Sequence, residues 1–184
     1  MSCVVLRIIS LIINMDELTI TEIVRGIADE SMKAQRIPLL QLLANKVADI
    51  TEPLTLEESN GVFIISLATL NATSDDSLVE LMLGLLTNAT ISEQNAQSFM
   101  AFIGKNDKYR TQFLNVLESF LNHNAQAELD ATDDAHSNMA SVMCNLCQIE
   151  ACRELLLKPS AEYMARMINQ VSNNYKLSCY SRAE

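Results

Sequence analysis

Glycine and proline are scarce in this sequence. Four glycines and three prolines make up about 4% of the 184 residues, where globular proteins average roughly 12%. Sandwiches and barrels of β-strands need many tight turns, which depend on these two residues. The scarcity therefore argues against a strand-rich fold and favours an all-α one.

The length suits a single domain over residues 1–184, since such a chain buries about 70% of its unfolded surface without disulfides or metal ions.

Basic residues are the minority among the charged ones. Thirteen lysines and arginines stand against twenty-three aspartates and glutamates, so the formal net charge is −10. Proteins bind nucleic acid largely by neutralising its phosphates with basic residues, and acidic residues are in excess here. No segment is basic enough to bind an anionic membrane surface. The charge argues against nucleic acid and membrane, and we expect proteins as partners.

A long uninterrupted hydrophobic run is also missing. The apolar opening Cys3–Ile13 is eleven residues long and contains Arg7, whereas a membrane-spanning helix needs about twenty. It lacks the basic start and the cleavage site of a signal peptide, so we interpret it as a buried helix. Five cysteines, an odd number, in a chain without an export signal indicate reduced thiols and a cytoplasmic location.

Residues that catalysis needs are few. The two histidines, His123 and His136, border a polar, acidic stretch at about residues 122–136, which we expect to be an extended loop with solvated histidines. No serine has the glycines of a nucleophile elbow, and the glycines are too isolated to form a phosphate-binding loop. We therefore expect neither an enzyme nor a cofactor.

Cys144, Cys147 and Cys152 raise the alternative of a zinc site, with either histidine as a further ligand. Structural zinc sites, however, favour cysteine pairs on turns. Here Cys144 and Cys147 lie three residues apart inside a helical pattern, where buried thiols pack well. No metal site is predicted.

Helix-start signals recur along the sequence. Three segments place a threonine or serine three residues before a glutamate, which is the pattern of a capping box. Pro38 and Pro159 can each occupy the first turn of a helix, ending near Asp49 and Val171 respectively. The β-branched runs Cys3–Ile13 and Val62–Leu67 could be buried strands on periodicity alone, but we interpret both as helix, because no turn residues flank the apolar stretches around them. Together with apolar stripes at helical spacing, these signals predict about ten helices. The capping boxes are Thr19–Glu22, Thr55–Glu58 and Ser77–Glu80, and the stripes are Leu78–Leu86, Phe99–Ile103 and Phe113–Leu121.

Three of the apolar runs end in similar four-residue strings, each with asparagine in second place. The strings are Leu70–Thr73, Thr87–Thr90 and Cys144–Cys147. Helix pairs that stack into a solenoid would explain this reuse, although the spacing is irregular. Glycosylation sequons begin at Asn71 and Asn88, but a chain that is not exported would not use them. The asparagines could make local hydrogen bonds near helix ends, or reach a bound peptide on the inner face of a solenoid.

Two segments resemble the HGH protein homologue family. Leu78–Glu93 is similar to the family's helix ADLAxMLLSNLTRSE, and Asn138–Leu157 is similar to its stretch YLASVFANLSQxxEGRxFLL. The likeness covers about Asp75 to Val171 and includes a polar insertion between the two segments. It departs from the family at Ala89, which replaces a leucine, and at Cys152, which replaces a glycine.

This resemblance implies an armadillo-like solenoid that acts as a non-enzymatic adaptor. Such an adaptor helps fold translation elongation factor two and links it to a cytosolic chaperonin. Family members are longer, with further C-terminal repeats, so we expect the factor to be retained more readily than the chaperonin. The family pattern covers Asn88, Asn145 and Arg153, and the repeated string adds Asn71, as candidate protein-binding residues. The alternative is a generic armadillo-like scaffold that binds another protein or peptide.

Overall fold

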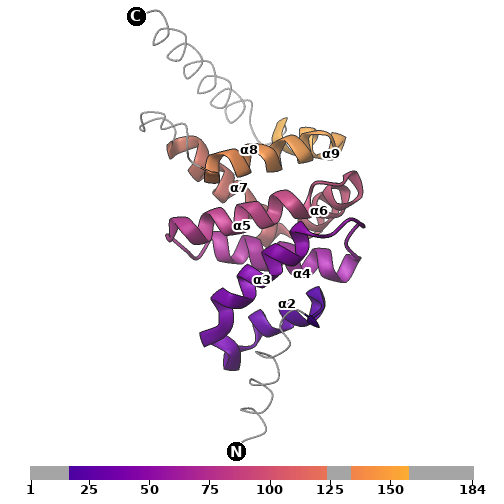
Figure 1. Cartoon of the computed structure of the whole chain (residues 1–184). Helices are drawn as coiled ribbons and strands as arrows, with labels where there is room; N and C mark the ends of the chain where they lie inside the picture. Colours follow the sequence, from indigo (N-terminus) through magenta and orange to yellow (C-terminus); the bar gives the residue numbers. More distant parts are fainter. Residues whose placement is uncertain (1–16, 124–133, 158–184) are drawn as a thin grey trace, which may run out of the picture.

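The chain is all-α over the part that a computed structural model describes, residues 17–123 and 134–157 (Figure 1). Those residues contain eight α-helices, one short 3₁₀-helix and no strand, which confirms the predicted fold class. The elements are α2 (Ile20–Ala28), η2 (Glu30–Gln35), α3 (Arg36–Ala48), α4 (Leu56–Leu70), α5 (Asp76–Ala89), α6 (Glu93–Lys105), α7 (Asp107–His123), α8 (Asp134–Cys147) and α9 (Glu150–Leu157).

The helices form a stack in which α5 is central. It packs against α3 and α4 on the N-terminal side and against α8 on the C-terminal side. Figure 1 shows α2, α3 and α4 in the lower part of the stack, α5 above them, and α8 and α9 at the top. The helices α3, α5 and α8 therefore follow one another along one side of the stack.

Two of the three predicted capping boxes are confirmed. The hydroxyl of Thr19 accepts a hydrogen bond from the backbone N–H of Glu22, whose carboxylate accepts one from the N–H of Thr19. The same reciprocal pair joins Thr55 and Glu58 at the start of α4. Both helices thus begin where the sequence pattern places them.

The third capping box, at Ser77–Glu80, is wrong. The helix begins earlier, because Asp75 is the N-cap of α5 and its carboxylate accepts a hydrogen bond from the N–H of Leu78 at 3.3 Å. Aspartate caps a helix as well as serine does, and the hydroxyl of Thr73 accepts a hydrogen bond from the N–H of Asp75 at 3.1 Å. Ser77 lies inside the first turn as an exposed residue.

A cluster of aromatic rings joins three helices in the core. The rings of Phe63 on α4 and Phe99 on α6 meet edge to face, with centroids 4.9 Å apart, and Phe99 meets Phe113 on α7 at 5.2 Å. The run Val62–Leu67 is helical, as predicted, although it is apolar on most sides. Its helix needs no single polar face, because α4 contacts α2, α5, α6 and α7.

The ends of the loop predicted at about residues 122–136 are helical in the structure. Helix α7 extends to His123, and α8 already begins at Asp134. An aspartate at the first helical position is favoured by the helix dipole, so acidic composition did not exclude a helix there. The loop interior, the apolar opening Cys3–Ile13 and the helix expected after Pro159 lie outside the described residues. Within those residues, no helix is long and apolar enough to cross a membrane.

Candidate functional site

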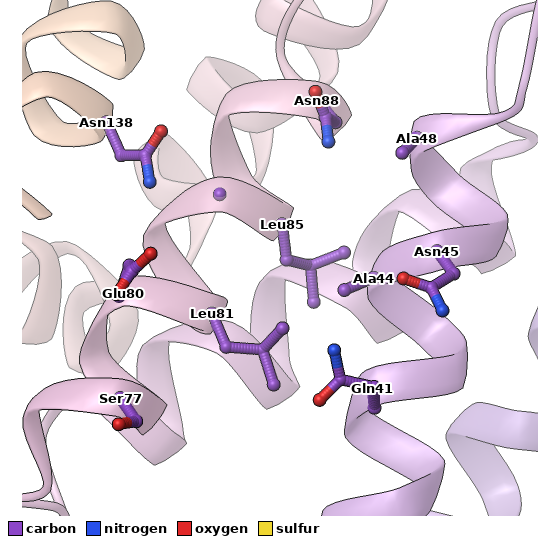
Figure 2. Close-up of a pocket in the computed structure, with 11 residues that line it drawn as sticks. Gln41, Ala44, Asn45, Ala48, Ser77, Glu80, Leu81, Leu85, Asn88 and Asn138 are labelled. Atoms are coloured by element: carbon purple, nitrogen blue, oxygen red, sulfur yellow. The ribbon is translucent and has the colours of Figure 1, made fainter. Parts of the chain in front are cut away.

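A groove lies between α3 and α5 and reaches the beginning of α8 (Figure 2). It has a volume of about 370 Å³, and we call it the inner groove. Helix α5 contributes to it from its first turn to its last, since helical residues three and four apart share one face. The lining residues are Gln41, Ala44, Asn45 and Ala48 from α3; Ser77, Glu80, Leu81, Gly84, Leu85 and Asn88 from α5; and Asn138 from α8.

Four side-chain amides line the inner groove: those of Gln41, Asn45, Asn88 and Asn138. Figure 2 shows them distributed over all three helices around the side chains of Leu81 and Leu85. None of these amides makes a hydrogen bond within residues 17–123 and 134–157. Each amide offers two N–H donors and one carbonyl acceptor. The groove therefore presents hydrogen-bonding capacity that the fold itself does not use.

The floor of the inner groove is small or apolar. Ala44 and Leu85 are buried, and Gly84 carries no side chain where α5 meets α8. A methyl group on Gly84 would lie 3.6 Å from Nδ2 of Asn138, an ordinary van der Waals contact. The groove thus has room at Gly84 that a longer side chain would fill.

Asn88 is the one residue of the predicted set that lines the inner groove. Asn71 instead caps the end of α4, where its Nδ2 donates to the carbonyl of Leu67 at 2.9 Å and to that of Gln112 at 3.2 Å. The bond to Leu67 is of the local kind that the sequence left open. The bond to Gln112, 41 residues away, joins the end of α4 to α7.

Asn145 and Arg153 are also engaged inside the protein. Nδ2 of Asn145 donates to the carbonyl of Thr87 at 3.2 Å and so joins α8 to α5. Nη1 of Arg153 donates to the carbonyls of Cys147 and Gln148, at 2.6 and 3.0 Å, where α8 ends. A cation at this position also complements the helix dipole.

Sequence reasoning missed three of the four groove amides. Gln41 and Asn45 are one turn apart on α3 and belong to none of the repeated strings. The signal that could have found them is their i, i+4 spacing beside the small residues Ala44 and Ala48. Asn138 opens the second segment of the family resemblance, but the strings drew attention to Asn145.

A second hollow lies between α5, α7 and α8, with a volume of about 500 Å³. We call it the Phe120 pocket. His136 lies in α8 rather than in a solvated loop, and its ring meets that of Phe120 edge to face at 5.1 Å. The pocket is lined by Ser74, Asp76, Val79, Glu80, Ser119, Phe120, Ala135 and His136, so Glu80 borders both hollows.

The three cysteines near the end of the stack have different environments. Cys144 is exposed, so the expectation that it packs as a buried thiol is wrong. Cys147 is half-buried and Cys152 is fully buried, and this burial raises the pKa of the Cys152 thiol to about 12. Among the residues that the structure describes, no three histidine, cysteine or acidic side chains are grouped so that they could hold a metal ion.

No family model matches this sequence, and comparisons with curated proteins and with solved structures also find no match.

Proposed function

We propose that this protein is a non-enzymatic, armadillo-like binding module whose inner groove holds an extended segment of a partner protein. The four unengaged amides of the inner groove carry this proposal. An extended main chain exposes N–H and carbonyl groups in alternation, and an amide side chain can pair with either group. Leu81 and Leu85, between these amides, provide apolar contact for side chains of the segment.

The dimensions of the groove suit a short segment. A chain that crosses from α3 over α5 to α8 spans two interhelical distances, about 16–20 Å. An extended chain advances about 3.3 Å per residue, so the groove holds about five or six residues. Stacked helices typically present such surfaces to partner proteins.

A peptide selection with groove variants tests this function. Random peptides of about eight residues, displayed on phage, are selected on the full chain and on two variants of Gly84. Gly84→Ala adds one methyl group in ordinary contact with Asn138 and leaves the groove open. Gly84→Met adds a long side chain to the groove floor, and methionine is a good helix former.

We expect the full chain and Gly84→Ala to enrich peptides, and Gly84→Met to enrich none. The helical circular dichroism spectrum of Gly84→Met should remain unchanged. Equal enrichment by Gly84→Met would place binding outside the inner groove and contradict the proposal. An absence of enrichment on the full chain would also count against it.

A narrower form of this proposal is an adaptor for translation elongation factor two, located in the cytoplasm. Its support is the family resemblance of two segments. Leu78–Glu93 contains most of α5, and Asn138–Leu157 contains most of α8 and all of α9. Helices α5 and α8 pack directly against each other and both line the inner groove. A link to the cytosolic chaperonin rests on the resemblance alone.

Binding to the purified factor tests this narrower form. The immobilised full chain is exposed to elongation factor two in low and in high salt, with Gly84→Met as the control. We expect capture in low salt that weakens as salt screens the exposed charges, because the net charge of −10 favours a basic surface. No capture in low salt would reject the elongation factor as partner, and capture that Gly84→Met leaves unchanged would reject the groove as its site.

A further inference from the structure

We propose that the inner groove selects segments with a lysine or arginine at one position, and that Glu80 and the adjoining Phe120 pocket bind this basic side chain. This inference rests on the proposed function and names the chemistry of its partner. Among the described residues that line the inner groove, Glu80 is the single charged one. In Figure 2 its carboxylate lies on the side of α5 that faces Asn138.

Within residues 17–123 and 134–157, no basic side chain neutralises the carboxylate of Glu80. It makes no ion pair in the described parts of the chain, and its side chain is exposed. Asp76 lies one turn earlier on α5 and lines the Phe120 pocket together with Glu80. Two like charges at i and i+4 on a helix repel each other, so a cation placed between them would remove an unfavourable interaction.

The Phe120 pocket suits the shape of a basic side chain. Lysine and arginine carry a charged end on an apolar stem, and Val79 and Phe120 supply apolar surface beside the two carboxylates. An aromatic ring such as that of Phe120, which meets His136 edge to face, can also attract a cation placed over its face. No lysine or arginine is found among the described residues that line either hollow.

Charge distinguishes this partner from other occupants. A second copy of the chain would bring another net charge of −10 against the same acidic surface. A metal ion would need more ligands than Asp76 and Glu80 supply, and although His136 lines the same pocket, no three acidic, histidine or cysteine side chains among the described residues are grouped so that they could hold a metal ion. A basic side chain on an otherwise extended segment needs only these two carboxylates.

A charge reversal in the peptide selection tests this inference. The selection described above is repeated on Glu80→Lys and on Glu93→Lys, which changes the net charge equally at an exposed helical residue outside both hollows. We expect peptides selected by the full chain and by Glu93→Lys to share one position occupied by lysine or arginine. On Glu80→Lys this preference should disappear or change to aspartate and glutamate at the same position.

A synthetic pair of peptides gives the matching affinity measurement. One selected peptide is made with arginine and with citrulline, its uncharged analogue, at the shared position. The affinity of the full chain should be roughly fivefold lower, or more, for the citrulline peptide than for the arginine peptide. The affinities of Glu80→Gln for the two peptides should lie within about twofold of each other.

The failures of the two proposals are distinguishable. Two results would overturn this inference and leave the proposed function intact. In the first, the selected peptides no longer bind Gly84→Met but share no basic position. In the second, they share a basic position and keep it when selected on Glu80→Lys. Peptides that no groove variant affects would overturn both.

Discussion

Asn145 is bonded to Thr87 across the contact between α8 and α5, with 3.2 Å between the amide Nδ2 and the carbonyl oxygen. The same Nδ2 lies 3.3 Å from Oγ1 of Thr90, and the hydroxyl of Thr87 donates to the carbonyl of Asn138 at 3.1 Å. These bonds join the last turn of α5 to both ends of α8. They hold together two of the three helices that form the inner groove.

The bond between Asn145 and Thr87 leads to the first prediction. Asn145→Ala should lower the free energy of unfolding by about 1–3 kcal/mol, because it leaves the partner groups on α5 without their donor. Asn88→Ala should change it by less than about 0.5 kcal/mol, since the Asn88 amide makes no hydrogen bond in the described residues. Urea unfolding of both variants measures the difference. Equal destabilisation by the two substitutions would assign Asn88 a structural role.

The second prediction concerns the contact between α2 and α4 at Gly61. A methyl group there would lie 2.7 Å from Cγ1 of Val24, so close that the Val24 side chain or the two helices would have to shift. Gly61→Ala should destabilise the protein by about 1–3 kcal/mol, and adding Val24→Ala should recover part of the loss. Gly104→Ala meets open space and should be neutral or stabilising, by up to about 1 kcal/mol. A neutral Gly61→Ala would show that α2 and α4 are not packed as described.

The third prediction concerns the start of α5. Asp75→Ala should cost about 0.5–2 kcal/mol of stability, because it removes the acceptor for the N–H of Leu78. Ser77→Ala should cost much less, since Ser77 is already inside the helix. Thermal unfolding compares the two variants, and a larger loss for Ser77→Ala would support the capping box that the structure contradicts.

The fourth prediction concerns thiol reactivity. Iodoacetamide at pH 8 should modify the exposed Cys144 and leave Cys152 unmodified until the protein is unfolded, as mapped by mass spectrometry. Burial raises the pKa of Cys152 to about 12, above the value of about 8.5 for an unfolded thiol. The stabilising contribution of this group is therefore complete below pH 8 and is lost as the pH rises from about 9 towards 12. Rapid modification of Cys152 in the folded protein would contradict this burial.

Sequence reasoning predicted the helical elements better than it predicted the site. Capping boxes such as Thr55–Glu58 are local interactions, so their pattern is complete within four residues. The boundary of α5 was missed because Asp75 is an equally good cap two residues before Ser77.

The role of each asparagine depends on contacts between distant segments. Asn88 and Asn145 occupy the same place in similar strings, yet the Asn88 amide makes no hydrogen bond to the residues that the structure describes, whereas that of Asn145 bonds to Thr87, 58 residues away. Gln41 and Asn45 become site residues only because α3 packs beside α5. No local pattern contains that information.

Titration calorimetry of a selected peptide against the double variant Asn45→Ala/Asn88→Ala measures whether the inner groove binds the peptide. The full chain and the double variant are compared in affinity and in melting temperature, with Gly104→Ala as the control substitution. We expect the double variant to bind about fivefold to a hundredfold more weakly at an unchanged melting temperature, since each lost hydrogen bond to the peptide is worth about 0.5–1.5 kcal/mol. An unchanged affinity in a folded double variant would contradict the assignment of the inner groove as the binding site.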